Sequence, residues 1–208
     1  MSDYRFPEIF PKGARLLLAS ASPRRRELLG GMGLSFEICP CEVDESVDPA
    51  VHPADATVLL AARKARAAYA LFGGEDSIIL ASDTLVECDG IPLGKPVDEA
   101  DAVRTLMTLS GRAHNVHTGV AVIYRGRLHA ARDTTAVRMR AFSENEAVAY
   151  VQTGEPMDKA GAYGIQGLGG RLVEGFDGAY DTVVGLPTRL TDLLLCRAIL
   201  HPEEGESL

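Results

Sequence analysis

The chain has 208 residues, of which 46% are hydrophobic and 24% are charged, so its composition is that of an ordinary globular protein. Its formal net charge of −8 argues against binding to nucleic acid polymers, although a local basic pocket remains compatible with it. No apolar run reaches about 18 residues, and residues 1–14 lack the apolar core of a signal peptide. We therefore expect a cytoplasmic protein that has no membrane partner.

Strands and helices alternate in the first half of the chain. Ser22 is a good N-cap residue and Pro23 suits the first helical position, so a helix begins shortly after the first apolar segment. Pro53 and Gly73 mark the start and the end of a second, alanine-rich helix. The sequence predicts strand 15–20, helix 23–32, strand 35–39, helix 53–70 and strand 77–82, which residues 84–88 can continue.

Turn and capping signals mark the elements of the second half. Asp89-Gly90 indicates a hairpin turn, and Ser143 with Glu146 forms a capping box at a helix start. Residues 154–187 are rich in glycine, but the apolar side chains among them indicate an ordered segment. The predicted elements are helix 98–109, strands 115–124 and 127–139 joined by Arg125-Gly126, helix 143–153 and helix 188–200.

This alternation predicts a single α/β domain over residues 1–208, with a central mixed, twisted sheet. We expect two lobes with a cleft between them. Residues 1–14 form an N-terminal extension, and the polar residues 201–208 are expected to be a frayed tail.

The start of the first long helix is an unusual place for three arginines. The helix dipole already makes this end positive and favours acidic side chains. Free backbone amides, the Ser20 hydroxyl and the guanidinium groups of Arg24 and Arg25 converge there, and a phosphate chain would supply the missing negative charge. Arg26 fits a solvated surface turn.

Three further positions carry polar groups at the edges of predicted elements: Lys64 near the end of helix 53–70, Asp83 with Thr84, and Lys95 between Gly94 and Pro96. Asp83 follows a buried strand, where ligands of α/β sheets gather, so it is a candidate general base, metal ligand or both; a cap or loop hydrogen-bond acceptor is the alternative. Lys95, whose backbone is restrained by its glycine and proline neighbours, is a candidate phosphate ligand. Glu45 is a weaker candidate, because it lies in an acidic loop and such loops are usually solvated.

Other signals for metal or nucleophilic chemistry are weak. His114 and His117 lie three residues apart on a predicted strand, so they point to opposite faces and do not chelate one ion. The four cysteines (Cys39, Cys41, Cys88 and Cys196) lack zinc-site spacing, and we expect reduced thiols. The P-loop pattern is absent, and no Ser/His/Asp set is evident.

Seven sequence blocks, taken in order, resemble the Maf family of nucleoside triphosphate pyrophosphatases. The resemblance extends from Leu16 to about Leu195, and the last block alone is quite specific. The blocks are ASASPRR at 19–25, VDE at 43–45, RKA at 63–65, ASDT at 81–84, GKP at 94–96, LSG at 109–111 and DKAGAYGIQGLGG at 158–170.

The resemblance implies an enzyme that hydrolyses a nucleoside triphosphate to the monophosphate and pyrophosphate with a divalent cation, Mg²⁺ or Mn²⁺. It also implies an elongated α/β fold with a deep active-site cleft, similar to that of inosine triphosphate pyrophosphatases, and a homodimer. The family has been linked to septum formation, so division arrest or the clearing of non-standard nucleotides is the expected role.

Three positions resemble the subfamily that acts on dTTP and UTP rather than on 7-methyl-GTP. They are Arg24, Thr84 and Gln166. The Gln166 amide offers a donor and an acceptor, which suits the O4 and N3–H edge of uracil or thymine.

The resemblance also assigns roles to the candidate residues. It implies that Asp83 is the general base and that Glu45 and Asp83 hold the metal, whereas the triphosphate is bound by Ser20, Arg24, Arg25, Lys64 and Lys95. Two alternatives remain: a house-cleaning pyrophosphatase for methylated or deaminated purine nucleotides, and a non-enzymatic nucleotide-binding regulator of septum formation. A regulator would be expected to lack Asp83 or the lysines, which this chain keeps.

Overall fold

The computed structural model describes residues 5–208, so residues 1–4 of the expected N-terminal extension lie outside the described part. Most predicted elements are confirmed, with ends that differ by one or a few residues. The first half contains α1 (Phe6–Ile9), β1 (Arg15–Leu18), α2 (Pro23–Gly31), β2 (Glu37–Ile38), α3 (Pro53–Phe72), β3 (Ser77–Cys88) and β4 (Ile91–Leu93).

The second half contains the two long strands and the remaining helices. These are α4 (Glu99–Leu109), β5 (Ala113–Tyr124), β6 (Arg127–Met139), α5 (Glu144–Val151), β7 (Val173–Asp177), α6 (Tyr180–Val184), α7 (Thr188–Leu200) and β8 (Glu206–Ser207). Short 3-10 turns are η1 (Glu155–Asp158), η2 (Ala160–Ala162), η3 (Leu168–Leu172) and η4 (Pro202–Glu204).

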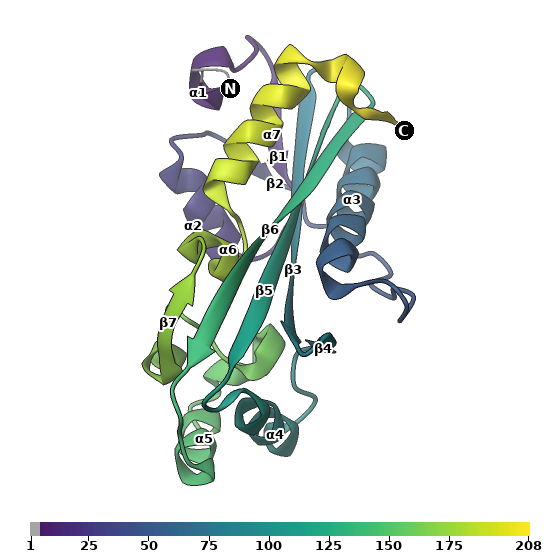
Figure 1. The fold of residues 1–208 in the computed structure, drawn as a ribbon. Helices are drawn as coiled ribbons and strands as arrows, with labels where there is room; N and C mark the ends of the chain where they lie inside the picture. Colours follow the sequence, from purple (N-terminus) through teal and green to yellow (C-terminus); the bar gives the residue numbers. More distant parts are fainter. Residues whose placement is uncertain (1–4) are drawn as a thin grey trace. The chain divides into compact units, whose positions relative to one another are not determined.

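The strands form one mixed sheet, as the alternating pattern predicts (Figure 1). Its order is β2-β1-β3-β5-β6-β7, with β4 paired to β3 and β8 paired to β6. β1 is parallel to both β2 and β3, whereas β4, β7 and β8 pair in the antiparallel sense.

The chain divides into two compact units. The first comprises the residues up to Asp83, Thr118–Asp133 and Gly185–Leu208, and the second comprises Thr84–His117 and Thr134–Val184. Strands β3, β5 and β6 contribute residues to both units. Each unit has an apolar core of its own.

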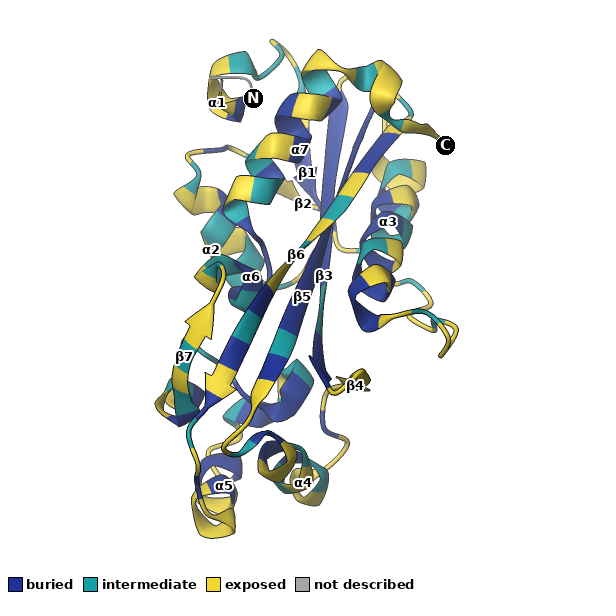
Figure 2. Ribbon diagram, in the orientation of Figure 1, coloured by how far each residue is buried: buried dark blue, intermediate teal, exposed yellow. Residues whose placement is uncertain are grey.

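The two faces of the β1–β3 pair in the first unit are covered by different helices. Successive side chains of a strand point to opposite faces, so Leu16 and Leu18 pack with α2 and α7, while Leu17 packs with α3. Parallel strands buried on both faces read as continuous apolar runs, and β1 and the first half of β3 are buried in this way (Figure 2).

Helix α3 lies very close to β5. A Cβ atom added at Gly119 of β5 would lie 2.3 Å from the backbone oxygen of Thr57 in α3. The contact face of α3 is lined by buried alanines, which allow this approach; they include Ala61, Ala65 and Ala68. The absence of a side chain at Gly119 therefore allows α3 to pack this closely against β5.

Local turn and cap signals in the second unit are confirmed. Ser143 and Glu146 form the capping box of α5, and the Asp89-Gly90 turn joins β3 to β4 with positive φ at both residues. The core of this unit packs α4 and α5 against β-strand side chains, including Leu106, Ala147 and Val137.

Two expectations about chain segments need correction. The expected frayed tail at 201–208 is ordered, because β8 pairs with the start of β6 and Glu206 forms an ion pair with Arg66. Asp83, expected at the end of a buried strand, lies inside β3; the predicted continuation over residues 84–88 is confirmed, since β4 pairs with Val86 to Cys88. Among the described helices, none combines the length and apolar character of a membrane span.

We expect Gly119→Ala to destabilise the protein by about 1–3 kcal/mol, because the new methyl group would overlap backbone atoms of α3 that cannot move aside. Urea unfolding followed by circular dichroism measures the loss. Gly30→Ala is the matched control, since a Cβ atom at Gly30 meets nothing within 4 Å. Equal stability of the two variants would contradict the close packing.

Candidate functional site

The start of α2 is organised by the two serines that precede it. The Ser22 Oγ accepts from the backbone N–H of Arg25 at 3.5 Å, as an N-cap does. Ser20, buried just after β1, accepts from the backbone N–H of Ser22 at 3.2 Å and from Nη1 of Arg25 at 3.5 Å. The structure therefore brings Ser20 and Arg25 together, as the sequence predicts.

Arg25 also ties α2 to the segment that precedes α7. Its Nε donates to the carbonyl oxygen of Gly185 at 3.0 Å, and the Ser82 Oγ of β3 donates to the same oxygen at 3.0 Å. Burial lowers the pKa of Arg25, while the nearby Asp83 carboxylate acts in the opposite direction. Arg24 is half-buried and Arg26 is exposed, as expected for a surface turn residue.

A charged cluster lies on the opposite face of β3. Residue 83 shares the face of Ile79 and Ala81, which pack against α3, and the Nζ of Lys64 in α3 lies 2.5 Å from Oδ1 of Asp83. The same Nζ lies 2.7 Å from Oε1 of Glu45. The side chains of Lys64 and Asp83 are largely buried, whereas that of Glu45 is 61% exposed.

The acidic loop that carries Glu45 is held by the neighbour of Lys64. Nη1 of Arg63 donates to the carbonyl oxygens of Asp44 and Ser46. The Asp44 carboxylate in turn accepts from the backbone N–H and the hydroxyl of Ser46. These bonds give the loop a defined conformation, so it is more than a solvated acidic stretch.

Asp83 stands where the parallel part of the sheet ends. β1 pairs with β3 only as far as Leu18 opposite Leu80, and the backbone N–H of Ala19 donates to the carbonyl of Leu80. Asp83 therefore lies just beyond the carboxyl end of β1, although its own strand continues. The position fits the rule that ligands gather at such ends.

Lys95, Gln166 and Thr84 belong to the second unit. Thr84 is the first residue of β3 that lies in this unit. Lys95 is exposed and makes no ion pair with any residue from 5 to 208. The carbonyl of its neighbour Gly94 accepts from the backbone N–H of Gly161 at 3.1 Å, which joins the GKP block to the glycine-rich block. Gln166 is exposed.

The two histidines of the HxxH pattern have separate partners, in agreement with their predicted opposite faces. His114 Nε2 lies 2.8 Å from the Tyr163 hydroxyl. His117 lies between Thr134 Oγ1 at 2.9 Å and Glu87 Oε2 at 3.2 Å. Both histidines are buried, and they do not meet at one point.

The cysteines do not form a site. All four are free thiols, and burial raises the pKa of Cys39 and of Cys196 to about 11. Thiols with such a pKa are protonated at neutral pH and are poor metal ligands and nucleophiles.

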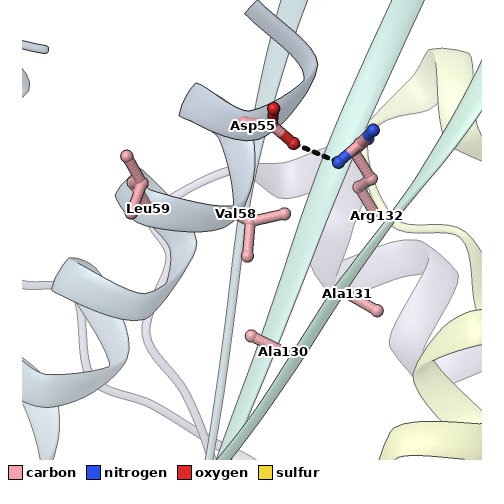
Figure 3. Close-up of a pocket in the computed structure, with 6 residues that line it drawn as sticks. All are labelled: Asp55, Val58, Leu59, Ala130, Ala131 and Arg132. Carbon is pink, nitrogen blue, oxygen red and sulfur yellow. Dashed lines mark hydrogen bonds and ion pairs between the residues drawn. The ribbon is translucent and has the colours of Figure 1, made fainter. Parts of the chain in front are cut away.

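A shallow pocket of about 440 Å³ lies between α3 and β6 in the first unit (Figure 3). Arg132 and Asp55 form an ion pair at its rim, and the remaining lining is apolar: Val58, Leu59, Ala130 and Ala131. None of the residues that the sequence singles out lines this pocket, so it is separate from the candidate site.

Sequence reasoning missed three residues that support the site. Ser82 and Gly185 join β3 to α2, and Arg63 fixes the acidic loop. Ser82 and Arg63 lie inside the recognised blocks, so their place next to candidate residues was a signal. Nothing local marks Gly185, since its partners are more than 100 residues away in the sequence.

Comparison with known proteins identifies the family to which the chain is similar. The model of the Maf-like protein family matches residues 15–198. A dTTP/UTP pyrophosphatase from Moorella thermoacetica is 52% identical over 184 residues, which are 88% of this chain and 94% of the relative. A dTTP/UTP pyrophosphatase from Vibrio cholerae is 50% identical over 182 residues, which are 88% of this chain and 97% of the relative.

Among solved structures, that of the Staphylococcus aureus Ham1 protein matches with a TM-score of 0.43 and 12% sequence identity, covering 91% of this chain and 99% of that chain. The expected similarity to the inosine triphosphate pyrophosphatase fold and the expected deep cleft stay predictions.

The buried His114 predicts a loss of stability in mild acid. Burial lowers its pKa to about 4, so between pH 6.5 and pH 4 the unfolded chain binds a proton that the folded chain does not. The contribution of His114 to the free energy of unfolding is retained above pH 6.5 and is lost as the pH decreases. Between pH 7 and pH 5 the loss from this residue is about 2 kcal/mol. Urea unfolding at both pH values measures the change.

His114→Gln is the comparison, because glutamine keeps a polar group opposite the Tyr163 hydroxyl and does not titrate. We expect this variant to lose less stability than the wild type between pH 7 and pH 5. An identical decrease in both proteins would assign the effect to other groups.

Proposed function

The chain belongs to the family of Maf-like proteins, and on that premise we propose that it hydrolyses dTTP and UTP to the nucleoside monophosphate and pyrophosphate. The observation that carries the proposal is that two sets of candidate residues lie close to the same part of β3. A cationic helix start lies next to Ser82, and the Asp83 carboxylate is held by Lys64 on the other face. The candidate phosphate ligands Ser20, Arg25 and Lys64 and the candidate base Asp83 therefore lie in one region of the first unit.

The phosphate-binding residues of the proposal are those at the start of α2 together with the lysines. Backbone N–H groups of α2, the Ser20 hydroxyl, Arg24 and Arg25 supply donors and positive charge for the triphosphate. Lys64 adds a compact charge beside Asp83. The role of Lys95 rests on the sequence resemblance.

Glu45 and Asp83 have the chemistry of a divalent cation site. Their carboxylate oxygens approach one common cation, the ammonium of Lys64, and oxygen ligands of this kind suit Mg²⁺ or Mn²⁺. A metal held by these two carboxylates would supply positive charge that neutralises the triphosphate.

The proposed reaction needs no covalent intermediate. Asp83 accepts a proton from a water molecule, the water oxygen forms a bond to the α-phosphorus, and the bond from that phosphorus to the bridging α–β oxygen breaks. Pyrophosphate leaves, and Arg24, Arg25 and Lys64 stabilise the charge that develops on it. Such reactions depend mainly on positioning and electrostatics.

Base selection is assigned to Arg24, Thr84 and Gln166. The support is that these residues stand where the sequence resembles the dTTP/UTP subfamily, and that relatives about 50% identical carry the name dTTP/UTP pyrophosphatase. We also propose, on the family resemblance, that the enzyme acts as a homodimer in the cytoplasm.

A substrate panel tests the function. The purified protein is incubated with dTTP, UTP, dUTP, CTP, GTP, 7-methyl-GTP or ITP in the presence of Mg²⁺ or Mn²⁺, and pyrophosphate release is measured. We expect dTTP and UTP to be hydrolysed at least about 10-fold faster than the purine nucleotides, since a site that pairs with a base edge discriminates strongly. Addition of EDTA is expected to stop the reaction.

Preferred hydrolysis of a purine nucleotide would keep the reaction and overturn the roles of Arg24, Thr84 and Gln166. No hydrolysis of any nucleotide would favour the nucleotide-binding regulator.

Asp83→Asn is expected to lower kcat by about 10²-fold or more while UTP still binds, because asparagine keeps the shape of the side chain but cannot accept the proton. Steady-state kinetics give kcat, and calorimetry gives the affinity for UTP. Glu75→Gln removes an exposed carboxylate elsewhere in the same unit and serves as the control. Normal turnover by Asp83→Asn would disprove its role as the base.

A further inference from the structure

Glu155 of η1 makes contacts that the proposed reaction does not explain. Its carboxylate accepts three hydrogen bonds: from the Tyr150 hydroxyl at 2.8 Å, from the backbone N–H of Leu168 at 2.9 Å and from that of Gly169 at 3.1 Å. The two backbone donors lie two and three residues after Gln166 in the chain. One side chain therefore satisfies the amides at the start of η3, which would otherwise need other partners.

Tyr150 of α5 holds the other end of the same turn. Its hydroxyl oxygen accepts from the backbone N–H of Gly164 at 3.1 Å while the hydroxyl donates to Glu155. Backbone groups on both sides of Gln166 are thus bound to one pair of side chains. Tyr150 is itself held in place by packing, because it is buried in the core of the second unit.

The glycines of this segment are explained by how closely it approaches that pair. A Cβ atom at Gly167 would lie 2.4 Å from Oε2 of Glu155, and one at Gly169 would lie 2.4 Å from the Tyr150 hydroxyl oxygen. A larger residue at either place would push the turn away. The glycine pattern is therefore explained by a backbone that packs directly against the side chains of Glu155 and Tyr150.

Glu155 is suited to hold the turn in its ionised form. Burial acts to raise its pKa, but the N–H groups of Gly169 and Leu168, the Tyr150 hydroxyl and nearby Lys159 outweigh this, and the pKa is lowered overall. Hydrogen bonds to a charged acceptor are roughly twice as strong as neutral ones.

Gln166 itself has no such restraint on its side chain. It is exposed and makes no hydrogen bond with residues 5–208, so its position depends on the backbone on either side of it. A side chain that reads a base edge needs a fixed backbone, because small displacements cost large factors in rate.

We infer that Glu155 is a positioning residue for base selection, which holds the turn between Gly164 and Gly169 so that Gln166 is presented to the pyrimidine. This rests on the proposed function, in which Gln166 contacts the base. Glu155 itself touches neither substrate nor metal in this account.

The test compares the ratio of kcat/KM for UTP to kcat/KM for GTP in wild type, Glu155→Ala and Glu155→Gln. Glu174→Gln is the matched control, since Glu174 is an exposed carboxylate in the same unit. We expect Glu155→Ala to reduce the ratio by about 10- to 100-fold, mainly through KM for UTP. Glu155→Gln is expected to be intermediate, because its amide keeps one acceptor oxygen and the volume of the side chain.

A double-mutant cycle separates positioning from general damage. In the Gln166→Ala background, Glu155→Ala is expected to cause no further loss of selectivity, because both changes remove the same contact. Two losses that multiply, or a uniform decrease in kcat for UTP and GTP with an unchanged ratio, would overturn the inference. If Glu155→Ala fails to fold, Glu155→Gln and its cycle with Gln166→Ala decide the question.

Binding measurements separate the positioning role of Glu155 from the proposed hydrolysis. If wild type hydrolyses no nucleotide, the proposed function fails, and the ratio of UTP to GTP affinities measured by calorimetry replaces the kinetic ratio. A decrease of that ratio in Glu155→Ala would still support a positioning role, and an unchanged ratio would refute it.

Discussion

A carboxylate within a buried strand has to be compensated, and Lys64 does this for Asp83. Removing the partner of a buried charge typically costs several kcal/mol, so α3 must place an ammonium on this face of β3. The alanine-lined face of α3 and the close approach at Gly119 allow the helix to lie near enough. Glu45 places a second carboxylate beside the same ammonium, and Arg63, one residue from Lys64, holds the loop that carries it.

The features that sequence predicted well are those set by neighbouring residues. The Ser22 cap, the Ser143–Glu146 capping box and the Asp89-Gly90 turn depend on a few adjacent positions, and all three are present. The charge of Arg24 and Arg25 at a helix start needed only the N-cap to be placed correctly. The juxtaposition of Lys64, Asp83 and Glu45 is different, since it followed from the family resemblance and not from any local pattern.

What sequence could not supply depends on pairing between distant segments. Asp83 was expected at a strand end because the apolar run stops there, and the continuation over residues 84–88, which sequence left open, is decided by pairing with β4. The C-terminal residues are polar and were expected to fray, yet β6 offers them an edge about 80 residues earlier in the chain. Glu155 was missed for the same reason, because the glycine pattern indicates a close approach without naming the side chain approached.

Several irregular segments at or beside candidate residues are held by side chains that bind their backbone. Arg63 binds the carbonyls around Glu45, Arg25 and Ser82 bind the carbonyl of Gly185, and Glu155 binds the amides after Gln166. Loops outside helices and sheets leave such backbone groups without partners, so a side chain from a regular or capped element satisfies them and restricts the loop at once. Candidate residues on loops are held in position by side chains that bind the loop backbone. This explains why residues with no direct chemical role are needed beside those that have one.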